Sequence, residues 1–307
     1  MDVGLCPAVR AGRGRSHDVQ AHPQTERRAS RPHRPFGRYL MALALLLALA
    51  AATENPCPAA IPIPPAIEDW RRKTYAPDNV KSIPPPMAEG APYIKAYTEA
   101  RKTDWADTCR YRDENAALMT QPAAARDVVF MGDSITWGWR YCNTAFDTGG
   151  GWVDRGISGQ TTAQMLVRFP GDVLALKPRV VHIMAGTNDI AGNSGPMTLG
   201  GIEANIAAMV TLAKAAGIRV VLAAVPPAKT FSWQPKLEPA PRIAALNARL
   251  RALAVREKIT FVDYGAVLAM PDGAMKDALT LDGVHPNAAG YAAIGPMAKK
   301  AVAAARK

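Results

Sequence analysis

The chain has 307 residues, of which 49% are hydrophobic and 21% charged, a composition typical of a globular protein with a sizeable core. Its formal net charge of +11 is diffuse: residues 1–40, with eight Arg and three acidic residues, contribute +5, and no dense Lys/Arg run follows. No nucleic-acid-binding motif accompanies this charge, so we exclude nucleic acid as a partner; weak attraction to anionic envelopes or polysaccharides fits better.

The first notable segment is the apolar run at residues 41–52, MALALLLALAAA. A charged flank precedes it and small residues end it, as in a secretory signal peptide cleaved near Ala50 or Ala52. A membrane span needs roughly 20 apolar residues, so the run predicts export and no stable span in the mature chain. A buried core helix is the alternative. Residues 1–40 are then either a disordered leader or the result of a start codon assigned too far upstream.

Cleavage would remove Cys6 and leave Cys57, Cys109 and Cys142, enough for one intramolecular disulfide. We expect this disulfide to be Cys109–Cys142, which would bracket the first strand, although spacing alone does not establish the pair. Cys57 lacks the small, apolar run of a lipid-anchor signal, and we expect it to be a free or surface cysteine. No Cys/His cluster has metal-ligand spacing, so no metal site is predicted.

A proline-rich segment follows, with ten prolines between Pro56 and Pro92. Proline removes a backbone donor and clashes within a helix, so we expect neither a regular helix nor a central strand here. Residues 93–119 are predicted to be helical. We interpret residues 54–125 as a Pro-rich arm plus a helix that packs on the main domain.

From residue 126 the pattern changes to alternating strands and helices. Continuous apolar runs predict strands buried on both faces, and these runs lie at residues 128–131, 180–184, 220–225 and 259–262, with a weaker one at 152–153. Apolar stripes at helical spacing separate them, formed by Ile202, Ile206, Met209 and Val210, and by Ile243, Leu246, Leu250 and Leu253. An Ala-rich helix is predicted at residues 288–305. Residues 126–307 therefore read as an α/β domain with a parallel sheet covered on both faces, which binds ligands at the carboxyl ends of its strands.

A serine directly follows the first strand, in Gly132-Asp133-Ser134. This position places its hydroxyl at the ligand-binding edge of the sheet, and Gly132 permits a tight turn. Alone, the motif is weak evidence, since a turn and an ordinary helix N-cap would look the same.

Near the C-terminus, Asp282 precedes His285 by three residues, on a loop that enters the last helix. A carboxylate at this spacing can fix the imidazole so that its other nitrogen takes a proton from a serine. The alternative is a capping aspartate and a surface histidine. Beyond the leader, however, the only other histidine is His182, which lies inside an apolar run and is expected to be a core residue. Ser134, Asp282 and His285 are therefore the candidate catalytic residues.

Two further polar elements follow strand ends, Gly156–Thr162 and Ala185–Asp189. Acyl transfer develops negative charge on a carbonyl oxygen, which needs donors aimed at it in advance. The backbone N–H of Gly159, the side-chain amide of Asn188 and the N–H of Ser134 are candidates for this oxyanion hole. Each element alone would also suit an ordinary turn.

Together, these four blocks, in this order, resemble the SGNH hydrolase superfamily, also called the GDSL-type lipase/acylhydrolase family. The resemblance covers roughly residues 126–303 and implies a three-layer, flavodoxin-like α/β/α fold with a five-stranded parallel sheet. It also implies hydrolysis of carboxylic esters by Ser134, Asp282 and His285, with Ser134, Gly159 and Asn188 as oxyanion donors and no cofactor. Thr187 stands where many members have glycine, and the 54–125 arm lies outside the resemblance.

The substrate is less constrained. Trp137 follows the candidate nucleophile and Trp233 is expected on a nearby loop; both are candidate substrate contacts, although core packing would explain them too. Export and an aromatic rim favour O-acetyl groups on carbohydrate, with a lysophospholipid or a short-chain acyl ester as the alternative. A non-catalytic carbohydrate- or envelope-binding protein on the same scaffold is the alternative of another class. An acyltransferase outcome and the oligomeric state are left open.

Overall fold

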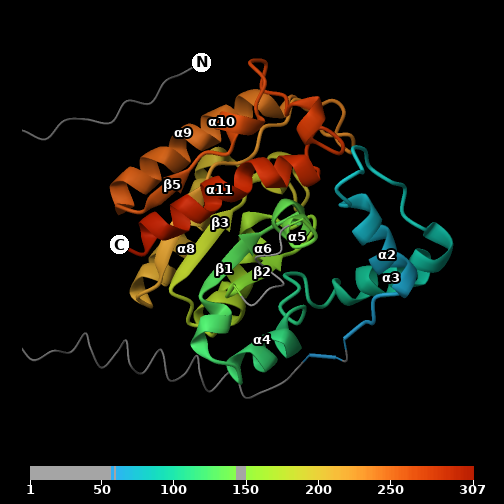
Figure 1. Ribbon diagram of the computed structural model, residues 1–307, viewed down its shortest axis with the longest axis horizontal. Helices are drawn as coiled ribbons and strands as arrows, with labels where there is room; N and C mark the ends of the chain where they lie inside the picture. Colours follow the sequence, from blue (N-terminus) through green and yellow to red (C-terminus); the bar gives the residue numbers. More distant parts are fainter. Residues whose placement is uncertain (1–56, 59, 143–149) are drawn as a thin grey trace, which may run out of the picture. The chain divides into compact units, whose positions relative to one another are not determined.

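The computed structural model describes residues 57–58, 60–142 and 150–307, so the leader and signal peptide predicted within residues 1–52 lie outside the described residues. The described part is built around a five-stranded, all-parallel sheet in the order β2-β1-β3-β4-β5 (Figure 1). The strands are β1 (Val128–Gly132), β2 (Trp152–Gly156), β3 (Val180–Met184), β4 (Arg219–Ala223) and β5 (Thr260–Val262). The predicted α/β fold is thereby confirmed, and the weak run at 152–153 proves to be a full strand.

The three central strands of this order are apolar because both of their faces are covered. Every residue of β1 and β3 is buried, and so is all of β4 except Arg219 at its start. Helices α5 (Ser134–Trp139) and α11 (Ala288–Ala305) pack against the strands, as do α8 (Leu199–Ala215) and α9 (Pro239–Glu257). The predicted stripes on α8 and α9 are buried, which confirms the period read from the sequence.

The remaining elements are short and lie mostly on the connections. They are α6 (Thr162–Phe169), the π-helical turn η3 (Pro170–Leu174), α7 (Thr187–Ile190), α10 (Gly265–Leu268) and two 3₁₀ turns, η1 (Ala123–Arg126) and η4 (Asp277–Leu279). Helix α6 packs on α8, and α7 packs on α9.

The arm differs from its prediction. The Pro-rich segment contains a regular helix, α2 (Pro65–Thr74), and α3 (Met87–Ala100) also begins within it. Proline is tolerated at the first position of a helix, where its missing N–H would have no intrahelical partner, and α2 begins at Pro65. The single helix predicted at 93–119 is wrong as well, because turns separate α3 from α4 (Arg112–Met119).

The arm is joined to the α/β domain through Tyr75, which directly follows α2 and is buried. Its ring stacks on Tyr141 with 5.7 Å between centroids, and lies 6.1 Å from the ring of Tyr291 on α11. The Tyr111 hydroxyl donates a hydrogen bond to the Gly156 carbonyl at the end of β2. The arm thus packs into the core of the α/β domain and reaches the carboxyl end of the sheet.

The disulfide also differs from its prediction. Cys57 pairs with Cys109, and Cys142 is a free thiol, so the expected Cys109–Cys142 pair is wrong. The expectation that Cys57 is free is wrong for the same reason. The Cα atoms of the bonded pair lie 5.6 Å apart, and the bond closes a loop that contains α2 and α3. The disulfide therefore links two parts of the arm to each other.

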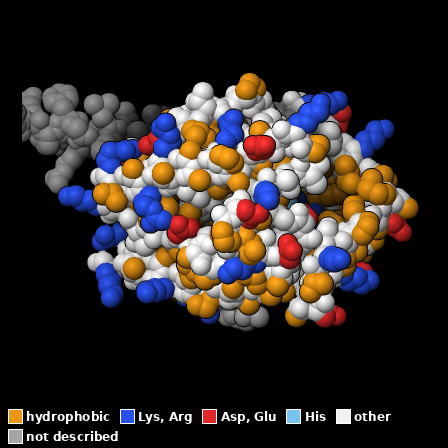
Figure 2. Space-filling view, turned by 90° about the horizontal axis from the view of Figure 1, so that it is seen from above, with side chains coloured by type: hydrophobic (Ala, Val, Ile, Leu, Met, Phe, Trp, Pro, Cys, Tyr) orange, Lys and Arg blue, Asp and Glu red, His pale blue; other side chains and the backbone are white. Residues whose placement is uncertain are grey.

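The charge on the described residues is dispersed. Figure 2 shows Lys and Arg side chains spread over one face among acidic and apolar ones, with no continuous basic block on that face. No helix within residues 57–58, 60–142 and 150–307 has the length and apolar character needed to cross a membrane.

Candidate functional site

The first functional group is the hydroxyl of Ser134, which begins helix α5 directly after strand β1. Asp133 caps this helix by accepting a hydrogen bond from the Ile135 N–H over 2.9 Å. A glycine is needed at position 132 because its neighbours lie close: a Cβ there would lie 2.0 Å from Oγ1 of Thr136 and 2.8 Å from the Met184 carbonyl oxygen. The strand-to-helix turn thus places Ser134, partly exposed, at the carboxyl edge of the sheet.

His285 and Asp282 extend from this serine as a hydrogen-bonded chain. Nε2 of His285 lies 2.9 Å from Oγ of Ser134, and Nδ1 lies 2.8 Å from Oδ2 of Asp282. Oδ1 of Asp282 accepts the backbone N–H of His285 over 2.8 Å, which fixes both oxygens of the carboxylate. The structure therefore brings together the three residues predicted from the sequence.

The loop that carries these two residues is held at both ends. Thr280 donates its hydroxyl to the His285 carbonyl over 2.8 Å and accepts the Gly283 N–H over 2.9 Å. Asn287 caps α11 by accepting the Gly290 N–H, and it donates to the Ala278 carbonyl over 3.0 Å. The imidazole is consequently positioned by backbone as well as by side-chain contacts.

The protonation of the pair follows from its surroundings. Burial opposes the charged form of His285, but the hydrogen bond and negative charge of Asp282, with a smaller effect of Asp133, raise its pKa above the ordinary 6.5. For Asp282, burial acts in the opposite direction to its hydrogen bond from His285, and the pKa of the carboxyl is lowered overall. Asp282 is therefore an anion that favours a protonated His285.

Two of the three predicted oxyanion donors, Gly159 and Asn188, lie just after β2 and β3. Asn188, on α7, is buried and donates from Nδ2 to the Gln160 carbonyl over 3.1 Å, with Oδ2 of Asp133 at 3.4 Å. Gly159 has a φ of +80°, which favours glycine, and a Cβ there would meet nothing within 4 Å. The side chain of Asn188 thus lies against the residue that precedes Ser134 and against the loop that carries Gly159.

Two residues of this region were missed in the sequence. Asp189, buried beside Asn188, accepts the N–H and the hydroxyl of Thr162 over 2.9 and 2.6 Å and so ties the loop after β2 to α7. Asn193 donates its side-chain amide to Oδ1 of Asn188 over 2.7 Å. Asp and Asn are common turn residues, and only the buried polar contacts distinguish these two.

The two candidate substrate contacts lie in different surroundings. Trp233 is 40% exposed, stacks on Phe231 and donates from Nε1 to Oδ1 of Asn193 over 3.2 Å, which places it beside the Asn188 region. Trp137 is half-buried on α5, where its ring faces the arm and the guanidinium of Arg71 lies 4.8 Å from its centroid. Trp233 is therefore the better placed of the two for substrate.

His182 is a core residue, as expected from its apolar run. It is fully buried, and Nε2 lies 2.8 Å from the hydroxyl of Tyr264. Burial lowers its pKa to about 3, so it is neutral at physiological pH. Within the described ranges, no group of three or more His, Cys, Asp or Glu residues could hold a metal ion.

A serine hydroxyl bonded to a histidine, which is bonded in turn to a carboxylate, is the arrangement by which many unrelated folds build a nucleophilic serine. Here it stands at the carboxyl edge of a parallel α/β sheet. This combination of a parallel α/β fold with a Ser-His-Asp chain is typical of serine hydrolases.

The chain belongs to the GDSL-like lipase/acylhydrolase family, whose model matches residues 130–293. Esterase TesA of Pseudomonas aeruginosa is 30% identical over 188 residues, 55% of this chain and 84% of that protein. The solved structure of a GDSL-like lipase from Bacteroides thetaiotaomicron is 42% identical, with a TM-score of 0.62, and covers 65% of this chain and 98% of its own. The structure of a putative acylhydrolase from Bacteroides fragilis is 43% identical, with a TM-score of 0.63, and covers 66% of this chain and 99% of its own. The protein is accordingly a hydrolase of ester bonds.

Proposed function

We propose that this protein is an exported serine esterase that hydrolyses carboxylic esters through an acyl-enzyme, with O-acetyl groups on carbohydrate as its substrate class. The observation that carries the proposal is the hydrogen-bonded chain Ser134–His285–Asp282. A serine is a weak nucleophile unless an adjacent base takes its proton, and Nε2 of His285 is within reach of that proton.

In the proposed reaction, Oγ of Ser134 attacks the ester carbonyl while its proton passes to Nε2 of His285. The negative oxygen that forms is stabilised by the N–H groups of Ser134 and Gly159 and by the Asn188 amide, whose long 3.4 Å contact with Oδ2 of Asp133 gives way to it. His285 then gives its proton to the leaving alcohol as the ester C–O bond breaks. A water activated by His285 releases the acid and restores Ser134. Asp282 stabilises the imidazolium in both halves of the cycle.

Two observations support export. The apolar run at residues 41–52 has the pattern of a signal peptide. A disulfide such as Cys57–Cys109 is typical of proteins that fold in an oxidising compartment, since disulfides are rare in the reducing cytosol.

The substrate class is supported by the exposed ring of Trp233, linked through Asn193 to Asn188. An exposed aromatic face beside the reacting carbonyl suits a sugar ring. A lysophospholipid would use the same chemistry and is distinguished by its long acyl chain. A short-chain acyl ester is the other alternative, which hydrolysis of an acetylated sugar distinguishes.

The test is hydrolysis of p-nitrophenyl esters from acetyl to dodecanoyl by the full chain, with Ser134→Ala and the exposed Ser82→Ala as a matched pair. We expect activity confined to short acyl chains, lost in Ser134→Ala and retained in Ser82→Ala. We also expect Asn188→Ala to lower kcat by about 10²–10³-fold. A preference for long chains would assign lipid substrates instead. If the wild-type protein were no more active than Ser134→Ala and were not labelled by a fluorophosphonate, the esterase would be refuted. The non-catalytic carbohydrate- or envelope-binding protein would then be the better interpretation.

A further inference from the structure

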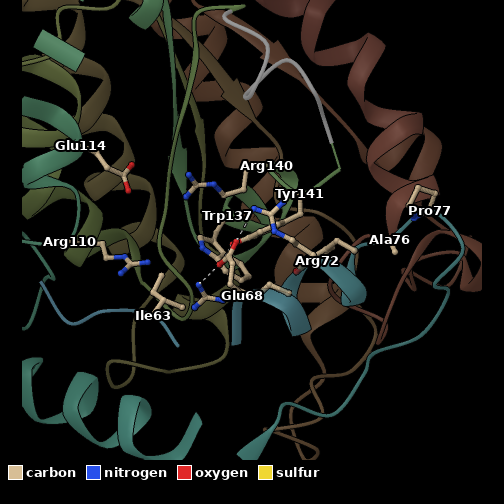
Figure 3. A pocket seen from close by; sticks show the side chains of 12 residues that line it. Ile63, Glu68, Arg72, Ala76, Pro77, Arg110, Glu114, Trp137, Arg140 and Tyr141 are labelled. Carbon is tan, nitrogen blue, oxygen red and sulfur yellow. Dashed lines mark hydrogen bonds and ion pairs between the residues drawn. The ribbon is translucent and has the colours of Figure 1, made fainter. Parts of the chain in front are cut away.

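A cavity of about 450 Å³ lies between the arm and helix α5. Its lining comes from three segments, within residues 63–77, 110–114 and 137–141. Figure 3 shows Glu68, Arg72, Trp137, Arg140 and Tyr141 gathered close together, with Arg110 and Glu114 set apart on another side. Neither Ser134 nor His285 lines this cavity, so it does not contain the candidate catalytic groups, although Trp137, a candidate substrate contact, belongs to its wall.

The charged lining of the cavity is unbalanced, with four arginines against two glutamates: Arg71, Arg72, Arg110, Arg140, Glu68 and Glu114. Both glutamates already have cationic partners. Glu68 pairs with Arg71 at 3.4 Å and Arg72 at 3.7 Å. Glu114 pairs at 3.5 Å with Arg155, which lies outside the lining. Arg140 pairs at 3.6 Å with Asp154, which also lies outside the lining. Arg110 and Arg72 are therefore the lining arginines whose charge is least neutralised.

The positive charges of two lining arginines, Arg110 and Arg72, are not neutralised by a close ion pair. Arg110 forms no ion pair with any residue that the structure describes, and its guanidinium lies 5.9 Å from the ring centroid of Tyr111. The nearby Asp107 acts on it only through longer-range electrostatics. Arg72 is 72% exposed and reaches Glu68 at 3.7 Å, a long and solvent-screened contact.

The buried side chain of Arg71 provides independent support, because one of its donors lacks an acceptor. Its side chain is only 10% exposed, and its Nε has no hydrogen-bond partner among the described residues. One face of its guanidinium is taken up by Trp137. A buried donor without an acceptor costs free energy, and a bound ligand that supplies the acceptor would remove that cost.

We propose that this cavity is a second binding site, for a small, sugar-sized ligand that carries a carboxylate or phosphate group. Guanidinium groups present planar donor pairs that match both oxyanions, and they bind them most strongly where solvent is partly excluded. The volume falls within the range of small-molecule sites. Tyr75, Trp137 and Tyr141 supply an aromatic wall on which the uncharged part of the ligand packs.

The site depends on the arm, not on the ester chemistry. The Cys57–Cys109 disulfide stands next to Arg110 in the chain and ties that segment to the residues just before α2. The proposal therefore holds whether or not the chain hydrolyses the esters named above.

The test is isothermal titration calorimetry of the full chain with three probes of similar size: glucuronate, glucose 6-phosphate and glucose. We expect one or both charged sugars to bind and glucose not to bind. Binding of glucuronate alone would assign a carboxylate ligand, and binding of glucose 6-phosphate alone a phosphate ligand. Equal binding of all three sugars, or of none, would overturn the proposal.

Three variants test the location. Arg110→Gln should weaken binding of the charged sugar by about tenfold and Arg72→Gln by about threefold, as expected for loss of charge-assisted hydrogen bonds. Arg249→Gln is the matched control, because it removes the same charge from an arginine that pairs with Glu203 on the far helices α8 and α9. Arg72 is exposed, so that variant should fold even where Arg110→Gln does not, which a melting curve checks. Equal affinity of Arg72→Gln and wild type, or an equal loss in Arg249→Gln, would refute a specific site.

Discussion

The side-chain amide of Asn193 donates a 2.7 Å hydrogen bond to Oδ1 of Asn188, and this bond orients the Asn188 amide. With Oδ1 occupied as an acceptor, the NH₂ group of Asn188 must point the other way, toward the Gln160 carbonyl and Asp133. Asn193 is in turn held by Trp233, which donates to its Oδ1 over 3.2 Å. A chain of three side chains thus runs from the protein surface to the proposed oxyanion hole.

Asn193→Ala should therefore lower kcat by about tenfold while KM changes little, because a donor aimed in advance matters most in the transition state. Asn193→Asp keeps the shape, lacks the donor and adds a negative charge beside the proposed oxyanion hole, so it should lower kcat at least as much as the alanine variant. Steady-state kinetics on p-nitrophenyl acetate measure both. Full activity in Asn193→Asp would show that Asn193 does not position the Asn188 amide.

The pH dependence should report on His285. The proposed base must be neutral, so kcat/KM falls as the pH drops through the pKa of His285. Burial lowers that pKa, but the contacts with Asp282 outweigh burial and raise it, so the acid limb of the profile should have its midpoint above pH 6.5.

Asp282→Asn should both slow the reaction, by about 10⁴-fold, and move this limb to lower pH. The substitution removes the negative charge that stabilises the imidazolium, and burial, which disfavours it, remains. The pH profile of the residual activity is the measurement. A limb that stays in place would mean that Asp282 does not set the protonation of His285.

The disulfide should contribute strongly to stability. It closes a loop across a sequence separation of 52 residues, so loss of the cross-link in Cys57→Ser/Cys109→Ser should lower the free energy of unfolding by about 2–4 kcal/mol. Urea denaturation measures the change. Cys142→Ser is the control, since that thiol is free and partly buried, and a change to serine there removes no cross-link and should cost much less. Equal stability of the double variant and Cys142→Ser would show that the disulfide is dispensable.

Much of the fold could be predicted because burial leaves a plain pattern. Strands covered on both faces are mostly apolar, and β1, β3 and β4 stand out as continuous runs. Strand β2 is buried as well but carries Asp154 and Arg155, so its run is weak. The chain also places Ser134, Asn188 and His285 after strand ends or before a helix, where parallel topology collects side chains at one edge.

The errors have equally physical causes. Proline breaks a helix in its interior, but Pro65 occupies the first position of α2, where it breaks no hydrogen bond. The disulfide depends on which cysteines the folded arm brings together, and sequence separation does not contain that information. Asn193 cannot be distinguished from other loop asparagines in the sequence, because its role depends on the hydrogen bond from its amide to Asn188.

Gly156→Ala should disrupt the site through packing alone. A Cβ at Gly156 would lie 2.2 Å from the backbone nitrogen of Trp137 and 2.7 Å from the carbonyl oxygen of Asp133. Backbone atoms cannot turn aside as side chains do, so α5 must shift away from β2 and carry Ser134 with it. We expect a loss of about 1–3 kcal/mol in stability together with a fall in kcat.

Gly171→Ala is the matched control for this substitution. A Cβ there would meet nothing within 4 Å, and the backbone of Gly171 does not have a positive φ. The added methyl group restricts the unfolded chain, so stability should be unchanged or rise by up to about 1 kcal/mol. Thermal melting and p-nitrophenyl acetate hydrolysis compare the two variants. If Gly156→Ala matched Gly171→Ala in both measurements, the close contact between β2 and α5 would not be what positions Ser134.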